Sequence, residues 1–416
     1  MSRRAPARAP RRAWTVLVYL AGDNSLDAAG VADLAEMKAA GSTADVAVVA
    51  EFDRGGGKGA RRYALRRGTA LAADVVADLG RLNTGDPRNL LDFVRWGIGA
   101  YPAERYALVL WNHGQGWDDT DIYADERLRR LRPLARGRVR RALFRPPVRR
   151  LLHDAVRKFR SRAILLDDDA RDFLDNGEMK TVVTQAAQVA GHKLDLLGMD
   201  ACLMAMAEVA FQVRDGAACA VGSEQTEPGG GWPYDRILRA LAARPAMDGR
   251  ALAATVVREY LASYGAADGV TQSACDLARA GALAEAVAAL AAALTGALGD
   301  PALRQRVFAA RGRVQSYEVA DNVDLGDLCA LLAAAAPRTD LAAAAAGVLR
   351  VLAGEGGDAG FVLAQGAKGS ALRASRGLAI YFPTRAVSPL YARLDWARAT
   401  GWGRFLAAYV RARRAR

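Results

Sequence analysis

Short apolar runs alternate with segments of helical spacing through most of the first 245 residues. Each run is brief and ends close to Gly, Asp, Asn or Glu, which is typical of a buried strand that leads into a turn. The predicted strands are residues 14–20, 44–52, 106–111, 194–199 and 217–223. Residues 26–40, 89–99, 176–190 and 203–213 have the apolar spacing of helices. Because alternating strands and helices form parallel βαβ units, the pattern predicts an α/β fold with a mostly parallel sheet flanked by helices.

The composition changes near residue 246, where alanine-rich segments begin. Residues 277–298 and 341–352 carry regular leucines and valines, which favours helices packed on the sheet over low-complexity sequence. Residues 377–383 predict a late strand. We therefore expect a basic disordered tail, an α/β domain with an arginine-rich insert, and a helix-rich C-terminal region packed on the same core. Their bounds are residues 1–12, 13–245 (insert 127–162) and 246–416.

The overall composition is that of a globular protein. Hydrophobic residues make up 52% of the 416 residues and charged residues 25%, which excludes global disorder. The strand-like apolar runs are far shorter than the ~20 residues that cross a bilayer, so we expect no integral membrane protein. No apolar stretch precedes the first strand, so a conventional signal peptide is not visible, and the cytoplasm is the default location.

The net charge of +13 is concentrated in two segments. Residues 1–12 hold five arginines and no acid, and residues 127–162 hold fourteen arginines, one lysine and one acid. The rest of the chain is therefore mildly acidic. A charge run is more often a solvated segment than a specific binding site, so we expect no nucleic-acid partner.

Two predicted strands end in side chains that can carry covalent chemistry. His113 follows the strand at 106–111, and Cys202 follows the strand at 194–199. In a parallel sheet both would lie at the same edge, where sites form. A cysteine nucleophile needs a base, and the predicted helix start after Cys202 would favour its thiolate. The backbone N–H groups of Gly114 and Cys202 could together stabilise an oxyanion.

The remaining cysteines and histidines carry weaker signals. Cys219, Cys275 and Cys329 lie among alanines and leucines, as small core side chains do. No C-x-x-C pair is present and histidines are few, so we expect neither a disulfide framework nor a metal site built from these residues. A core role for Cys202 and His113 also stays open, because sequence does not show that their two strands are neighbours.

Five stretches resemble the clostripain family of cysteine peptidases, in the family's order. They are the strand and turn at residues 14–26, Trp-Asn-His-Gly-Gln-Gly-Trp at 111–117, Asp-Ala-Cys-Leu-Met-Ala-Met-Ala-Glu at 200–208, the glycine-rich stretch at 222–234, and the late strand at 377–383. The resemblance implies a caspase-like fold, a His113/Cys202 dyad and cleavage after basic residues. It also implies that Asp200 lies in the pocket for the basic side chain. The insert at 127–162 departs from the family pattern.

Other candidates for substrate binding follow the predicted strands. Glu224 and Glu227 could pair with a substrate guanidinium, although acids at such positions also form turns and helix caps. Trp117 and Trp232 lie beside glycines and could line the cleft or simply pack. We expect no cofactor. Calcium is an alternative that some relatives suggest, with the acidic run at 167–169 as a weak candidate for its ligands.

The sequence thus favours a cysteine endopeptidase that cleaves after Arg or Lys through an acyl-enzyme intermediate. Its partners would be peptides or proteins with basic residues. Family members often cut themselves between the two catalytic residues, and the insert at 127–162 supplies arginines there. The alternative is a catalytically inactive caspase-like protein that binds nucleic acid or acidic surfaces through its arginine-rich segments.

Overall fold

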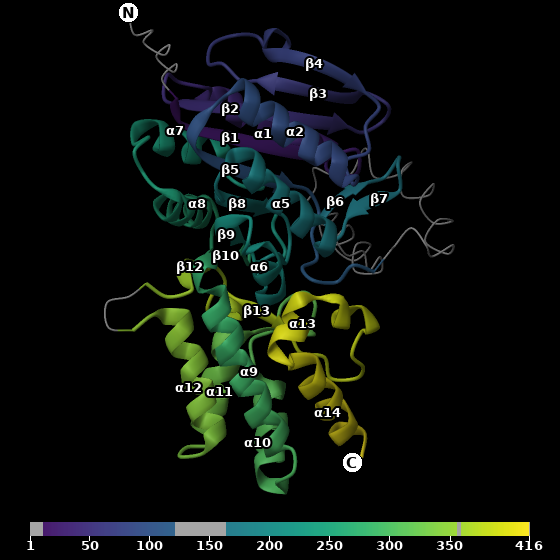
Figure 1. Cartoon of the computed structure of the whole chain (residues 1–416), viewed down its shortest axis with the longest axis vertical. Coiled ribbons are helices and arrows are strands. Elements are labelled where there is room, and N and C mark those ends of the chain that lie inside the picture. The colour runs from purple at the N-terminus through teal and green to yellow at the C-terminus, as the bar shows by residue number, and fades with distance from the viewer. Residues whose placement is uncertain (1–10, 121–163, 356–358, 416) are drawn as a thin grey trace, which may run out of the picture.

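A nine-stranded sheet forms the centre of the protein (Figure 1). The computed structural model describes residues 11–120, 164–355 and 359–415. The strand order across the sheet is β12-β10-β9-β8-β5-β1-β2-β3-β4. The five inner strands, β9 to β2 in this order, run parallel, and antiparallel strands extend the sheet at both sides. The predicted α/β fold with a mostly parallel sheet is therefore confirmed.

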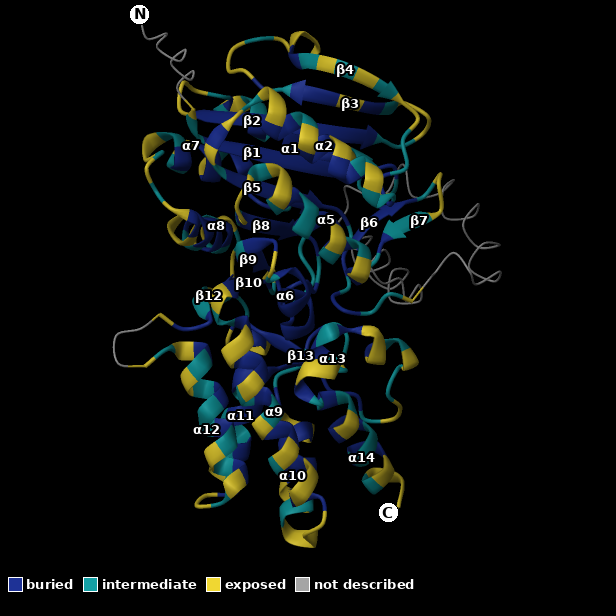
Figure 2. Ribbon diagram, in the orientation of Figure 1, coloured by how far each residue is buried: buried dark blue, intermediate teal, exposed yellow. Residues whose placement is uncertain are grey.

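The inner strands are almost completely buried, as expected for a sheet covered on both faces (Figure 2). Their bounds are β1 Arg12–Gly22, β2 Val46–Arg54, β5 Ala103–Trp111, β8 Leu194–Asp200 and β9 Ala217–Gly222. The outer strands are β3 Gly59–Ala64, β4 Val75–Gly80, β10 Thr271–Asp276 and β12 Val362–Ala367. Exposure rises in β4, where alternate residues face solvent.

Helices cover the two faces of the sheet because successive strand residues point to opposite sides. Leu17 and Tyr19 pack with α2 and α5, whereas Val16 and Val18 pack with α1, α7 and α8. The first pair is α2 Pro87–Ala100 and α5 Asn176–Ala190. The other face carries α1 Asp27–Ala40, α7 Tyr234–Ala243 and α8 Gly249–Ser263. The short helix α6 Ala207–Val213 and the hairpin of β6 Ile164–Asp167 and β7 Asp172–Leu174 lie near the carboxyl ends of the strands.

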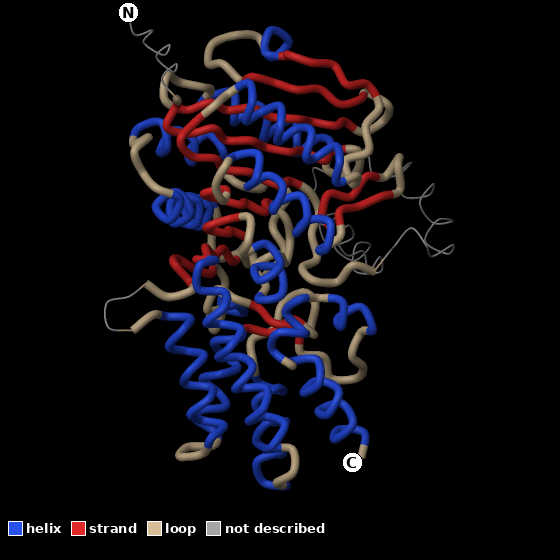
Figure 3. The backbone as a smooth tube through the Cα atoms, in the orientation of Figure 1, coloured by secondary structure: helices blue, strands red, loops and turns tan. Residues whose placement is uncertain are grey.

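A second, mostly helical half follows the sheet (Figure 3). It contains α9 Ala280–Ala297, α10 Pro301–Arg313, α11 Leu325–Ala335, α12 Asp340–Ala353, α13 Asp395–Thr400 and α14 Trp402–Arg414. A two-stranded sheet of β11 Asn322–Asp324 and β13 Ala379–Tyr381 lies where the two halves meet. The core of this half is continuous with that on the α2/α5 face of the large sheet.

The C-terminal region contributes more to the large sheet than its sequence indicated. β10 and β12 complete one edge of that sheet, although both come from beyond residue 246. The predicted late strand forms β13 instead, which pairs with β11. Residues 11–12 of the expected tail are described, and Arg12 begins β1. The insert at 127–162 lies outside the described residues.

The helix α9 lies in a longer apolar segment than the strand-like runs on which the membrane prediction was based. Among the residues that the structure describes, the segment Leu277–Ala297 is long and apolar enough to cross a bilayer by length and composition alone. Leu283, Val287, Leu290 and Leu294 lie on one side of α9 and are buried. This face packs in the core of the helical half, as a core helix does.

Candidate active site

The register of the parallel strands β5 and β8 brings His113 and Cys202 to the same edge of the sheet. β5 and β8 are neighbours, and Trp111 lies opposite Asp200 at their carboxyl ends. His113 lies two residues after Trp111, and Cys202 lies two residues after Asp200. The Asn112 N–H donates to the Asp200 carbonyl over 3.3 Å, which extends the pairing beyond the strands. The strands that carry His113 and Cys202 are therefore neighbours, which the sequence alone did not show.

Gly114 lies against the backbone that carries the thiol. A Cβ atom at Gly114 would be 2.7 Å from the Cys202 carbonyl oxygen and 2.9 Å from the Ala201 side chain, too close for any real contact. Glycine therefore lets the loop after β5 approach the loop after β8. The Gly114 N–H has no acceptor in the part of the chain that the structure describes. It is available for a substrate oxygen.

Cys202 differs from the other cysteines in its accessibility. It is half-buried, whereas Cys219, Cys275 and Cys329 are buried. Burial and, to a smaller extent, the nearby charge of Asp200 raise the pKa of the Cys202 thiol to about 11, although the Glu227 N–H donates to Sγ over 3.3 Å and acts in the opposite direction. The expected support from a helix start is wrong, because α6 begins at Ala207 and not directly after Cys202. The raised pKa favours the neutral thiol over the thiolate.

His113 is held at the edge of the sheet by its neighbour Asn112. The Asn112 amide donates to the carbonyls of Ala21 and Leu166, and its Oδ1 accepts from the His113 N–H. Burial lowers the pKa of His113, and the charge of Asp168 acts in the opposite direction. His113 Nε2 lies 2.9 Å from Ser25 Oγ, within hydrogen-bond distance. Burial therefore favours the neutral imidazole, which can act as a base.

Three acidic side chains meet beside Cys202, and we call Asp33, Asp200 and Glu227 the acid cluster. The carboxyl groups of Asp200 and Glu227 interact: Asp200 raises the pKa of Glu227, and Glu227 lowers that of Asp200. Burial raises the pKa of both, and that of Asp33 rises to about 9 through burial and the charge of Asp200. No described Lys or Arg forms a salt bridge with any of the three.

Neutral donors hold the acid cluster in place. Tyr234 Oη donates to Asp200 over 2.8 Å, the Trp232 N–H donates to the same carboxylate over 3.3 Å, and Trp111 Nε1 donates to Asp33 over 2.6 Å. A Cβ atom at Gly231 would lie 3.2 Å from an oxygen of Asp200 and 3.2 Å from one of Asp33. Gly231 therefore lies directly over both carboxyl groups.

Several buried oxygens near the acid cluster lack a partner among the described residues. They are Glu227 Oε2, Gln272 Oε1 and Tyr260 Oη. Gln272 Nε2 donates to the other oxygen of Glu227 over 3.2 Å, and the charges of Glu227 and Asp200 raise the pKa of Tyr260 beyond the effect of burial. Buried acceptors are costly when unpaired, so their presence together points to a ligand with several N–H donors.

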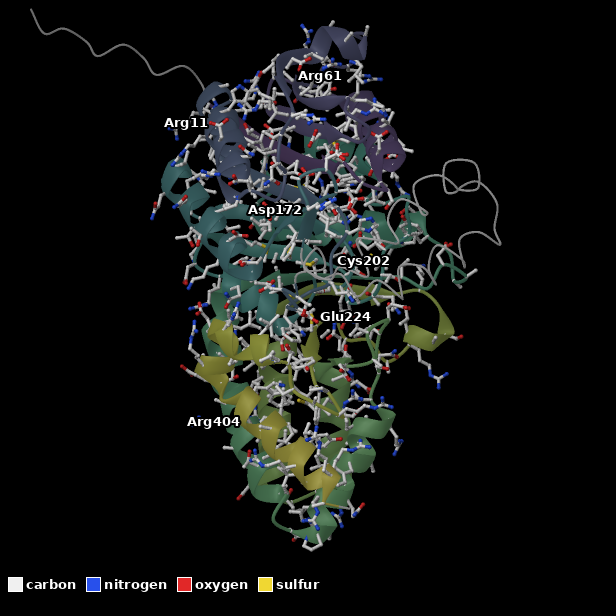
Figure 4. The ribbon with its side chains drawn as sticks, turned by 90° about the vertical axis from the view of Figure 1, so that its right-hand side faces the viewer. Arg11, Arg61, Asp172, Cys202, Glu224 and Arg404 are labelled. Atoms are coloured by element: carbon white, nitrogen blue, oxygen red, sulfur yellow. The ribbon has the colours of Figure 1, made fainter. Side chains whose placement is uncertain are left out.

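Glu224, which the sequence suggested for substrate binding, does not belong to the acid cluster. Its carboxyl group accepts from Tyr317 Oη over 2.6 Å and from the Gly377 N–H over 3.2 Å, and it interacts with Asp324. These partners belong to the helical half, and Glu224 is only 2% exposed. Figure 4 shows Glu224 on the side of Cys202 that faces this half. Glu224 therefore links the two halves instead of joining Asp200.

The two tryptophans are core residues, so the predicted cleft-lining role is wrong for their rings. Trp232 is 1% exposed, and its ring lies against Gly198 of β8. Trp117 is buried between Tyr381 and Tyr391, with ring centroids 4.3 and 5.0 Å away. Trp232 contributes to the site through its backbone N–H on Asp200. A buried ring has no surface left for substrate.

The acidic run at 167–169 has a structural role at its first residue. Asp167 accepts from the N–H groups of Thr84 and Ala170 over 2.9 and 2.8 Å, as a turn-forming carboxylate does. Within residues 11–120, 164–355 and 359–415, no group of three or more His, Cys, Asp or Glu side chains is arranged to hold a metal ion.

Sequence reasoning missed Asp33, Gln272, Tyr260 and Ser25. Asp33 had a usable signal, because it lies at helical spacing with Gly30, Leu34 and Met37 on the buried face of α1. An acid on an apolar helical face is unusual and indicates a special environment. The other three carry no pattern that separates them from ordinary strand, helix or turn residues.

Comparisons of the sequence match the chain to one family of known proteins. The sequence model of the Clostripain family matches residues 18–128 and 152–374, and the gap between these stretches falls in the arginine-rich segment. Clostripain of Hathewaya histolytica is 26% identical over 255 residues, which is 54% of this chain and 41% of clostripain. The aligned part thus spans less than half of that relative's length.

Two solved structures share the fold over nearly the whole chain. A secreted C11 cysteine protease of Bacteroides thetaiotaomicron, in complex with an irreversible peptide inhibitor, is 19% identical with a TM-score of 0.63 and covers 94% of this chain and 99% of its own. An inactive zymogen C11 protease of Parabacteroides distasonis is 20% identical with a TM-score of 0.64 and covers 95% and 99%. These likenesses show the shared fold, and the family match over most of its length shows that the chain belongs to the clostripain family of cysteine peptidases.

Proposed function

We propose that the protein is a cysteine endopeptidase that hydrolyses peptide bonds after Arg or Lys. The observation that carries this proposal is the acid cluster beside the half-buried Cys202, whose carboxyl groups have no basic partner among the described residues. An ionised buried carboxylate is stable only when a cation pairs with it. The side chain that precedes the cleaved bond would supply that cation.

The proposed reaction starts from a neutral thiol and a neutral imidazole. His113 takes the Cys202 proton as the sulfur attacks the scissile carbonyl, because the raised pKa of Cys202 and the lowered pKa of His113 disfavour a preformed ion pair. The oxyanion accepts from the N–H groups of Gly114 and Cys202. His113 then protonates the leaving amine, which gives a thioester. It next deprotonates a water molecule that hydrolyses this thioester and regenerates the thiol.

The acceptor arrangement supports a preference for Arg over Lys. A guanidinium presents five N–H donors in a plane, whereas an ammonium presents three. Glu227 Oε2, Gln272 Oε1 and Tyr260 Oη offer unused acceptors in addition to Asp200. A guanidinium could satisfy more of them at once, and each acceptor left unpaired would cost about 1–3 kcal/mol.

A panel of fluorogenic peptides that differ only at the residue before the cleaved bond tests the proposal. We expect kcat/KM to be highest for Arg, lower for Lys, and about 100-fold or more lower for Gln or Leu. Parallel assays with EDTA and with added CaCl₂ check that the reaction proceeds without a metal. No cleavage of any basic peptide, together with DNA affinity that falls steeply with salt, would instead favour the binding-protein alternative.

We also propose that the enzyme cuts itself in the arginine-rich insert at 127–162, which lies between His113 and Cys202 in the chain. This expectation rests on the sequence and on the proposed specificity. Purified wild-type protein should convert into two fragments cut between residues 127 and 162, as mass spectrometry of the new termini would show. The Cys202→Ala protein should remain one chain. Cutting of that variant at the same sites and rate would contradict self-cleavage.

A further inference from the structure

We propose that Ser25 is a positioning residue for His113 and fixes which imidazole nitrogen faces the thiol. The inference rests on the proposed function and adds a third residue to its dyad. His113 Nε2 lies 2.9 Å from Ser25 Oγ. If the Nε2–H donates to Ser25, the Nδ1 lone pair is left to accept the Cys202 proton. One hydrogen bond then sets both the tautomer and the ring orientation.

The backbone around Ser25 is fixed from both sides by Asn24. The Asn24 amide donates to the carbonyls of Ala21 and Leu166 over 2.8 Å each, and its Oδ1 accepts from the Leu26 N–H over 2.9 Å. These bonds tie the turn after β1 to both β1 and β6. A serine on such a turn presents its hydroxyl from a defined position.

His113 is anchored to the same two carbonyl oxygens. The Asn112 amide also donates to Ala21 and Leu166, and its Oδ1 accepts from the His113 N–H. Asn24 and Asn112 thus hold Ser25 and His113 on one shared frame at the ends of β1, β5 and β6. Because Asn24 and Asn112 bond to the same two carbonyl oxygens, the fold sets the distance between Ser25 and His113. That distance does not depend on the motion of two independent loops.

The electrostatic surroundings suit a hydroxyl in this place. Burial lowers the pKa of His113, and Asp168 is the charged group that opposes this effect. A neutral hydroxyl accepts from the Nε2–H in both the neutral and the protonated ring, and so keeps its orientation through each proton transfer. It bonds more strongly to the imidazolium, so losing it would lower the pKa of His113 further.

The kinetic experiment compares Ser25→Ala with Ser25→Thr, which keeps the hydroxyl, and with Ser370→Ala, which removes another exposed serine hydroxyl. We expect Ser25→Ala to lower kcat about 10-fold on an Arg peptide, with KM changed less than about twofold. The acidic limb of its pH profile should move to lower pH. Ser25→Thr should stay within about threefold of wild type, and Ser370→Ala should match it. An unchanged kcat and pH profile in Ser25→Ala, or equal losses in the Ala and Thr variants, would overturn the proposal.

An activity-independent readout separates this inference from the proposed function. The chain has three histidines, so ¹⁵N NMR can resolve the His113 ring in full-length Cys202→Ala protein with and without Ser25→Ala. We expect the Nε2–H tautomer with Ser25 present, and a mixed tautomer with a lower pKa without it. If wild type cleaves no basic peptide, the proposed function fails while this measurement still decides the role of Ser25. The same tautomer and pKa in both proteins would show that Ser25 does not position the ring.

Discussion

Replacing Cys202 with alanine should lower kcat on an Arg peptide by roughly 10⁴-fold or more, with the fold intact by circular dichroism. His113→Ala should have a comparable effect, because the thiol, with a pKa of about 11, needs a base to attack. The double variant should be no slower than either single variant, since the two groups act in the same step. Substantial activity in Cys202→Ala would exclude the proposed nucleophile.

Alkylation gives a second check on the nucleophile. Iodoacetamide should label Cys202 first, because this thiol is half-buried whereas Cys219, Cys275 and Cys329 are buried. Peptide mapping after brief labelling would identify the modified residue. Earlier labelling of Cys219, Cys275 or Cys329 would count against the assignment.

Removing charge from the acid cluster should change specificity by a large factor. We expect Asp200→Asn and Glu227→Gln each to lower kcat/KM for an Arg peptide about 100-fold or more, and to lower it much less for an otherwise identical Gln peptide. The physical reason is that a buried guanidinium loses a charged partner while the uncharged side chain does not. The quantity to measure is the Arg/Gln ratio of kcat/KM for each variant.

Glu224→Gln is the matched control for this series. Glu224 is a buried glutamate in the same β9–α7 connection as Glu227, but its carboxyl group interacts with Tyr317, Gly377 and Asp324. We expect Glu224→Gln to leave the Arg/Gln ratio unchanged, even if it weakens the link between the two halves. Equal losses on Arg and Gln peptides in Asp200→Asn would show that Asp200 is structural and that another group selects the basic side chain.

The parallel part of the sheet could be predicted from the sequence because a strand that is buried on both faces appears as a continuous apolar run. A strand such as β5 must be apolar at nearly every position, and the polar residues that follow it mark its end. The edge strands have no continuous apolar run. β4 alternates between half-buried and exposed residues, and β10 contains Thr271, Gln272 and Ser273, which are buried although polar. The hydroxyl groups of Thr271 and Ser273 find their partners, Ser223 and the Gly377 carbonyl, only in the folded chain.

Strand ends and motifs are local features, so the sequence was enough to predict the fold class and the family and to identify His113, Cys202 and Asp200 as candidates. Only the tertiary structure placed β5 beside β8, brought Asp33 from α1 and Glu227 from the loop after β9 to Asp200, and moved Glu224 to another cluster. The physical reason is that an ionisable group's neighbours are set by packing between elements far apart in the chain. Those neighbours, and not the residue type, decide whether a carboxylate binds substrate or joins two halves of a protein.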